Sequence, residues 1–83
     1  RADALLLTHL EHVRYCTGFT GSSGALLLLP DRAVFVTDGR YALQGAREAA
    51  GCEPLVVPTG GTLTEAAARR AAEAGVGSLA FES

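Results

Sequence analysis

Hydrophobic residues concentrate in five short runs along the chain, at residues 4–7, 25–29, 33–37, 53–57 and 78–82. Apolar runs of this length are typical of strands that are buried in a sheet. The central residues of the third run, Val34, Phe35 and Val36, are all apolar. This pattern predicts that helices cover both faces of that strand.

Residues 39–50 have the spacing of a helix that packs against a sheet along one side. Asp38 stands at the N-cap position of this segment, and Gly51 stands at the C′ position. The apolar side of this helix is predicted to consist of Ala42, Leu43, Ala46, Ala49 and Ala50.

A second helix is predicted from residue 63 to the glycine at position 75. Thr62 and Glu65 have the spacing of a capping box at its start. Its apolar stripe consists of Leu63, Ala66, Ala67, Ala71 and Ala74. The same spacing at Thr8 and Glu11 predicts a shorter helix within residues 8–15, with Thr8 as its N-cap.

The connections between these elements predict a mixed sheet. Pro30, Asp31 and Arg32 form a turn signal between two apolar runs, which should therefore pair as an antiparallel hairpin. Each of the helices predicted at residues 39–50 and 63–75 is followed by another strand, at residues 53–57 and 78–82. We therefore expect an α/β fold, in which a mixed sheet of about five strands is flanked by helices.

Composition narrows the classes of function. The chain has 83 residues, enough for one domain, and a net charge of −2, which argues against nucleic acid or a membrane as the main partner. No run approaches the ~18 apolar residues of a membrane helix. All 7 basic residues are arginine, so lysine chemistry is excluded. Two cysteines, Cys16 and Cys52, predict reduced and buried thiols in a cytosolic protein.

Three glycines, Gly18, Gly21 and Gly24, precede the hairpin. A dinucleotide-binding loop has the spacing Gly-x-Gly-x-x-Gly before a helix, whereas here each interval is three residues and a strand follows. A nucleophile elbow ends in a glycine that the sequence around Ser23 lacks, and no histidine or lysine lies nearby in sequence to activate Ser22 or Ser23. The segment is predicted to be a tight turn.

A pair of histidines, His9 and His12, offers a second candidate for chemistry. The two are three residues apart, whereas zinc peptidase motifs place histidines four apart around a glutamate. No third ligand is evident in the sequence. We therefore expect exposed helix histidines and no metal ligand.

Arg40 is a third candidate, because it stands in the first turn of its predicted helix. The helix macrodipole disfavours a cation at that end. Two interpretations stay open: Asp38 pairs with Arg40, or Arg40 binds an anion at the domain surface.

Three ordered blocks of sequence resemble a known family. They are ValArgTyrCysThrGlyPheThrGlySerSerGlyAla at 13–25, ProAspArgAla at 30–33, and ThrAspGlyArgTyr at 37–41 with Gln44 and Ala46 behind it. They resemble the N-terminal, creatinase/prolidase-type domain of Xaa-Pro aminopeptidases and prolidases. The chain departs from the family at His12, where asparagine is usual, and at Cys16, where leucine is common.

The resemblance implies a ribonuclease H-like fold and a non-catalytic role. Residues 1–83 would form this N-terminal domain, truncated at its N-terminus and without the C-terminal catalytic domain. In the family that second domain is of the pita-bread type and carries five metal ligands (two Asp, one His, two Glu) for two Mn, Co or Zn ions. The parent would be a cytoplasmic Xaa-Pro metallopeptidase, whereas this domain alone would be inactive.

The resemblance also assigns surface roles, because the family's N-terminal domain builds a dimer or tetramer and shapes access of peptide substrates. The residues assigned to substrate access or an interface are Gly18, Phe19, Gly21, Ser22, Ser23, Gly24, Arg40 and Tyr41. No catalytic residue, metal ligand or cofactor is assigned within the chain. Two alternatives stay open: the N-terminal domain of a creatinase-like amidinohydrolase, and a protein-binding module of a catalytically dead relative.

Overall fold

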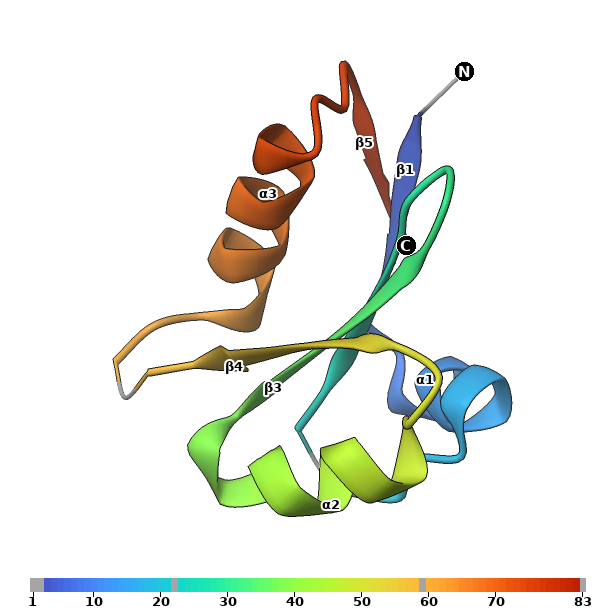
Figure 1. Ribbon diagram of the computed structural model, residues 1–83, viewed down its shortest axis with the longest axis vertical. Coiled ribbons are helices and arrows are strands. Elements are labelled where there is room, and N and C mark those ends of the chain that lie inside the picture. The colour runs from blue at the N-terminus through green and yellow to red at the C-terminus, as the bar shows by residue number, and fades with distance from the viewer. Residues whose placement is uncertain (1–2, 22, 59, 83) are drawn as a thin grey trace.

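The protein is described here by a computed structural model, which covers residues 3–21, 23–58 and 60–82. Its centre is a sheet of five strands in the order β4-β3-β2-β1-β5 (Figure 1). The strands are β1 (Ala4–Leu7), β2 (Ala25–Leu28), β3 (Ala33–Asp38), β4 (Glu53–Val57) and β5 (Leu79–Phe81). The strands β1, β2 and β3 pair antiparallel, whereas β4 pairs in parallel with β3 and β5 in parallel with β1. The prediction of a mixed, five-stranded α/β fold is confirmed.

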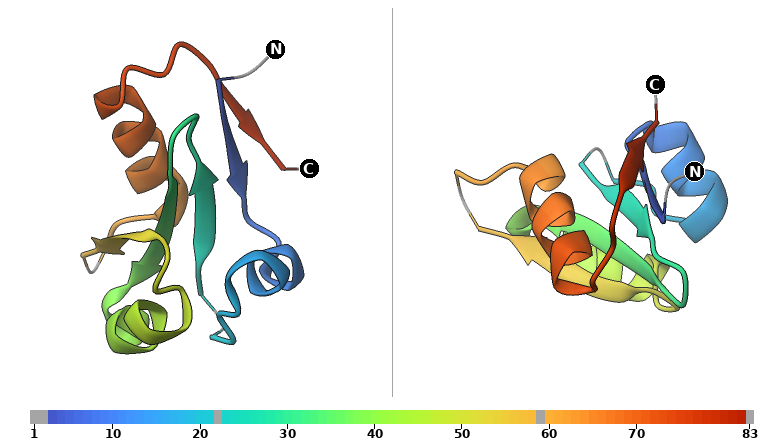
Figure 2. Two further views of the ribbon diagram at one scale, coloured as in Figure 1. Left: turned by 45° about the vertical axis from the view of Figure 1, so that its right-hand side comes forward. Right: turned by 90° about the horizontal axis from the view of Figure 1, so that it is seen from above.

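Helices lie on both faces of this sheet. They are α1 (Leu10–Thr17), α2 (Ala42–Glu48) and α3 (Leu63–Glu73), and a short 3-10 helix, η1 (Gly39–Tyr41), precedes α2. The helix α3 covers one face, whereas α1 and α2 lie together against the other (Figures 1 and 2). Among the described residues, no helix is long and apolar enough to cross a membrane.

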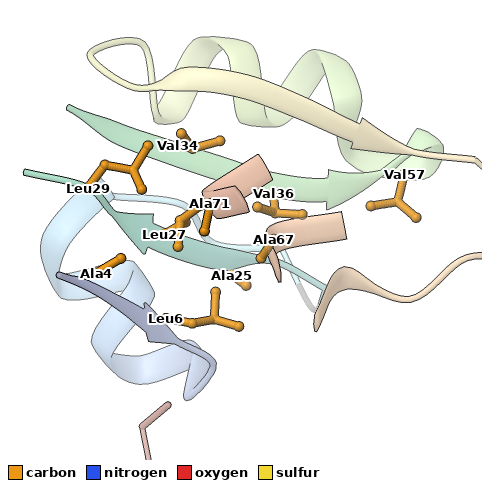
Figure 3. Packing of buried hydrophobic residues seen from close by; sticks show 10 residues of the cluster. All are labelled: Ala4, Leu6, Ala25, Leu27, Leu29, Val34, Val36, Val57, Ala67 and Ala71. Atoms are coloured by element: carbon orange, nitrogen blue, oxygen red, sulfur yellow. The ribbon is translucent and has the colours of Figure 1, made fainter. Parts of the chain in front are cut away.

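The face under α3 carries the larger hydrophobic cluster (Figure 3). Its members are Ala4, Leu6, Ala25, Leu27, Leu29, Val34, Val36, Val57, Ala67 and Ala71. Two small residues of α3, Ala67 and Ala71, allow its backbone to lie close to the valines of β3. The N-cap half of the predicted capping box is confirmed, because the Thr62 hydroxyl accepts a hydrogen bond from the Glu65 amide at 3.1 Å. The Glu65 carboxylate accepts from the Thr62 hydroxyl at 3.0 Å.

The opposite face carries a second cluster beneath α1 and α2. It consists of Val13, Phe19, Leu26, Phe35 and Ala49. Side chains alternate along a strand, so Phe35 points to this face while Val34 and Val36 point to the other. The prediction that both faces of β3 are covered is therefore confirmed.

The start of α1 differs from the prediction. Thr8 does not cap the helix; His9 occupies the N-cap position, without a side-chain hydrogen bond, and α1 ends at Thr17. The reason is a long-range contact: the Glu82 carboxylate accepts hydrogen bonds from the amides of Thr8 and His9, at 2.9 Å each. These two amides precede the first turn of α1, and within that turn the His12 amide donates to the His9 carbonyl at 3.0 Å.

The helix predicted at residues 39–50 also differs from the prediction, since it is shorter and is rotated about its axis. Its first turn is η1, and α2 ends at a C-cap on Ala49. The predicted apolar stripe was right for Ala49, which is buried, but wrong for Leu43, which is 77% exposed, and it omitted Gly45, which faces the sheet. The predicted members Ala46 and Ala50 are exposed as well. The ring of Phe35 lies under α2 and admits only small residues there, since a Cβ on Gly45 would lie 2.7 Å from its Cε2 atom.

Two smaller predictions were also wrong. Gly51 does not form a left-handed C′ residue, because the described glycines with positive φ are Gly18, Gly60 and Gly75. Cys16 is exposed on α1 and not buried, while Cys52 is partly buried; both are free thiols. Cys16 is exposed because only Val13 of α1 is buried against the sheet.

Candidate functional site

The segment that carries Gly18, Gly21 and Gly24, called here the glycine-rich segment, packs around an aromatic cluster. The cluster is formed by Phe19, Phe35 and Tyr41. The ring centroids of Phe19 and Phe35 are 4.6 Å apart, and those of Phe19 and Tyr41 are 5.7 Å apart at an interplanar angle of 88°. Phe19 is only 1% exposed, so it anchors the segment to the sheet. The structure therefore brings two of the predicted site residues, Phe19 and Tyr41, into contact.

Glycine is required at the three positions of this segment for different structural reasons. Gly18 has φ +84° and ends α1, with its amide donating to the Arg14 carbonyl at 2.7 Å. A Cβ on Gly21 would lie 2.3 Å from Cζ of Phe19, and a Cβ on Gly24 would lie 2.9 Å from Cζ of Phe35. The close approach is thus made by rings of this chain. Ser22 lies outside the described residues.

A buried hydroxyl fixes the end of the segment on β3. Thr37 is 2% exposed, and its Oγ1 donates to the Ser23 carbonyl at 2.7 Å. This contact positions the backbone of Ser23 immediately before β2 begins. Ser23 therefore has a positioning role in the fold.

A polar network that the sequence analysis missed joins the segment to α2. The Thr20 amide donates to Oε1 of Glu48 at 2.7 Å, and Gln44 Nε2 donates to Thr20 Oγ1 at 3.0 Å. The Thr20 amide is also the main reason why the pKa of Glu48 is lowered. Gln44 and Glu48 are four residues apart on one helix face, which was the available signal, but their partner Thr20 is distant in sequence.

Asp38 and Arg40 form a compact pair at the start of η1. Asp38 Oδ1 accepts from the Arg40 amide at 3.0 Å, and Arg40 Nη2 donates to Oδ2 at 2.8 Å. The arginine side chain is the main cause of the lowered pKa of Asp38. The N-cap role of Asp38 and its pairing with Arg40 are thereby confirmed.

Arg40 nevertheless remains open to solvent beside a groove. Its side chain is 71% exposed, and its guanidinium carbon lies 5.3 Å from the centroid of the Tyr41 ring. The groove is lined by Asp38, Gly39, Arg40, Val57, Pro58, Gly60 and Gly61. Arg40 therefore presents a charged, exposed group in a concave setting.

The two histidines lie on a carboxylate that sequence reasoning did not find. His12 Nδ1–H donates to Oε2 of Glu82, and His9 Nδ1 lies 3.7 Å from the same oxygen. Backbone hydrogen bonds, first that from the His9 amide, lower the pKa of Glu82 to about 2. The hydrogen bond to Glu82 raises the pKa of His12. The exposure predicted for both histidines is confirmed, although His9 lies at the N-cap and not within α1. Glu82 is a third neighbouring group that the sequence did not reveal.

The chain does not fit the family's catalytic metal pair. Over the described ranges, one group of three or more His, Cys, Asp or Glu side chains could share an ion: His9, His12 and Glu82. That group lacks the aspartates and the second glutamate of the five-ligand set. The described residues therefore do not supply the five-ligand set.

A model of the Creatinase/Prolidase N-terminal domain matches residues 1–83 of this sequence. The chain belongs to this family. The blocks of sequence around the glycine-rich segment and around Asp38–Arg40 were thus assigned correctly from their resemblance.

Solved structures of the creatinase/prolidase family share the fold. The N-terminal domain of the cytoplasmic peptidase PepQ from Mycobacterium tuberculosis H37Rv is 46% identical, with a TM-score of 0.86 over 98% of this chain and 62% of that one. A Xaa-Pro dipeptidase from Bacillus anthracis is 37% identical, with a TM-score of 0.85 over 98% of this chain and 22% of that one. Creatinase/prolidase N-terminal domains thus have the architecture described above.

A curated relative agrees with this assignment. The uncharacterized peptidase YqhT of Bacillus subtilis (strain 168) is 39% identical over 80 residues, which are 96% of this chain. The chain spans only 22% of the length of that relative. The similarity therefore concerns one creatinase/prolidase N-terminal domain of a much longer peptidase.

Proposed function

We propose that this chain is the non-catalytic N-terminal domain of a cytoplasmic Xaa-Pro metallopeptidase, which hydrolyses the bond between an N-terminal residue and a following proline. The observation that carries the proposal is the family match over residues 1–83. Two similar structures are named Xaa-Pro dipeptidase and X-Pro aminopeptidase, which favours a peptidase over an amidinohydrolase. The cytoplasmic location rests on the relative that is described as a cytoplasmic peptidase.

In this proposal the hydrolytic chemistry belongs to a C-terminal domain outside residues 1–83. A similar N-terminal domain, 47% identical over 70% of this chain, is described as part of a putative metallopeptidase from Corynebacterium diphtheriae. Two divalent ions held there would activate water. The residues of the present chain contribute surfaces instead of that chemistry.

The surface that we assign to assembly and substrate access runs from the glycine-rich segment to α2. Arg40 is exposed beside the groove, and Leu43, three residues later, is a large apolar side chain that is 77% exposed. Arginine is enriched at protein interfaces, and the fully buried core of an interface is more apolar than the rest of the protein surface. The aromatic cluster positions this surface, because Phe19 packs against Tyr41, which follows Arg40 directly.

Substrate access is tested with Arg40→Ala in the full-length protein, with Arg47→Ala, an exposed arginine of α2, as the matched control. Loss of binding alone should raise KM and leave kcat at saturating peptide unchanged. A thousandfold loss of kcat with intact fold would contradict the proposal. Gly21→Val is unsuitable, since its side chain would collide with Phe19.

Assembly is tested separately with Leu43→Ser, again in the full-length protein. Light scattering should show a smaller oligomer for this variant, whereas Ala46→Ser, a polar change at another exposed position of α2, should not alter the mass. An unchanged mass for Leu43→Ser would exclude Leu43 from the interface. The 83-residue chain itself should not cleave Xaa-Pro peptides when Mn²⁺, Co²⁺ or Zn²⁺ is added.

A further inference from the structure

We propose that His9, His12 and Glu82 form a binding site for a single Zn²⁺ ion. One donor atom from each of the three side chains lies within 4.8 Å of the other two. Imidazole nitrogen and carboxylate oxygen are two of the three donor types that zinc uses in proteins. The proposal concerns this chain alone and does not depend on the peptidase function.

The three donor atoms are close enough to bind one ion after small movements of their side chains. In a tetrahedral zinc site each ligand atom lies ~2.0–2.2 Å from the metal, so ligand atoms are about 3.4 Å from one another. The side chains of His9 and His12 are 43% and 55% exposed, so neither ring is enclosed by other side chains. The two ring centroids are 5.4 Å apart, and both Nδ1 atoms face Oε2 of Glu82, which is bonded to His12 and lies 3.7 Å from His9.

The carboxylate is held in an orientation that suits a ligand. Oε1 of Glu82 accepts from the amides of Thr8 and His9, at 2.9 Å each, while Oε2 faces the two histidines. The Glu82 side chain is only 12% exposed. Hydrogen bonds from the backbone to one oxygen position the other, as outer-shell partners do in metal sites. A metal ion would replace the proton that His12 now donates to Oε2.

The donor set discriminates among cations. Ca²⁺ and Mg²⁺ require oxygen ligands, whereas two imidazoles with one carboxylate suit zinc and the later transition metals. Three protein ligands leave a fourth position on the exposed side of the histidine rings, where water completes the coordination. The site is therefore a three-ligand zinc site that is open to solvent.

Zinc at this position would join distant parts of the fold. His12 lies in α1, and Glu82 follows β5, 70 residues later in the sequence. A ligand that binds the folded chain and not the unfolded chain raises the stability as its concentration increases. Zn²⁺ should therefore raise the melting temperature of the domain in a concentration-dependent manner.

The experiment is a calorimetric titration of the tag-free 83-residue chain with Zn²⁺ at about pH 8. The crystallised N-terminal domain of the M. tuberculosis relative is longer than this chain, which covers 62% of it, so circular dichroism first establishes that the 83-residue chain and each variant are folded. We expect one ion per chain, with affinity at least tenfold weaker in His9→Ala, His12→Ala and Glu82→Gln. Mg²⁺ should not compete. Glutamine at position 82 retains an oxygen that accepts the Thr8 and His9 amides, so this variant should keep the fold.

Matched control variants distinguish zinc binding at this site from zinc binding by other residues of the chain. Glu11→Gln changes a neighbouring carboxylate of α1, and Cys16→Ser removes the exposed thiol on the same helix; neither should weaken binding more than threefold or so. Because the chain has 2 histidines, NMR signals of both imidazoles should shift together with one ion bound. The proposal is overturned if the chain does not bind Zn²⁺, if Cys16→Ser abolishes binding, or if folded His9→Ala and His12→Ala variants bind as before.

Discussion

Replacing Gly45 by alanine should destabilise the domain, although it would stabilise an ordinary helix. Gly45 lies inside α2, where alanine is better than glycine by about 0.5–1 kcal/mol because glycine loses more backbone entropy on folding. Tertiary packing opposes this preference. A Cβ at position 45 would lie 2.7 Å from Cε2 and 3.2 Å from Cδ2 of Phe35.

The ring of Phe35 has little room to move away. Phe35 is 3% exposed, its centroid lies 4.6 Å from that of Phe19, and its far edge faces Gly24. Carbon atoms pack favourably at about 3.5–4.0 Å, and overpacking a buried site costs about 1–3 kcal/mol. After the gain in helix propensity is subtracted, Gly45→Ala should lower the free energy of unfolding by about 1 kcal/mol. The melting temperature should fall by about 4–8 °C.

Urea unfolding followed by circular dichroism would measure this effect. Gly51→Ala is the matched control, because no described residue beyond its two chain neighbours has an atom within 4 Å of its Cβ position and its φ is not positive. That variant should be neutral or more stable by up to about 1 kcal/mol. The cost of Gly45→Ala should shrink in a Phe35→Leu background, since the two sites are in contact. If Gly45→Ala stabilises the chain as much as Gly51→Ala does, the packing argument is refuted.

Three further predictions concern other contacts. Thr62→Ala should cost about 1 kcal/mol of stability in urea unfolding, because it removes the α3 cap, while Thr62→Ser should retain most of it. Arg70 donates to Glu53 at 2.6 Å and lowers the pKa of Glu53 from 4.5 to about 2. The pair therefore stabilises the fold above pH 4.5 and loses this contribution toward pH 2. The difference in urea midpoint between the chain and Glu53→Gln should shrink over that interval; a constant difference would exclude this account. Cys16 should react with iodoacetamide before Cys52, whose pKa is raised by burial, and equal rates would show that the exposures are wrong.

Local chemistry made much of the fold predictable from the sequence. The apolar runs predict all five strands, and the turn residues Pro30–Arg32 predict the hairpin, because both signals act between neighbours along the chain. The caps at Asp38 and Thr62 were predictable for the same reason, since each hydroxyl or carboxylate bonds an amide two or three residues away. The sequence blocks were also enough to indicate the family.

Contacts between distant segments decided the features that the sequence could not show. The face of α2 that packs on the sheet follows from the Phe35 ring, which excludes Leu43 and selects Gly45, against the apolar pattern of the helix itself. The start of α1 and the histidine cluster depend on Glu82, whose carboxylate reaches them only because β5 pairs with β1. Spacing along the chain records which side chains share a helix face, but a partner 70 residues away is brought near by the sheet alone.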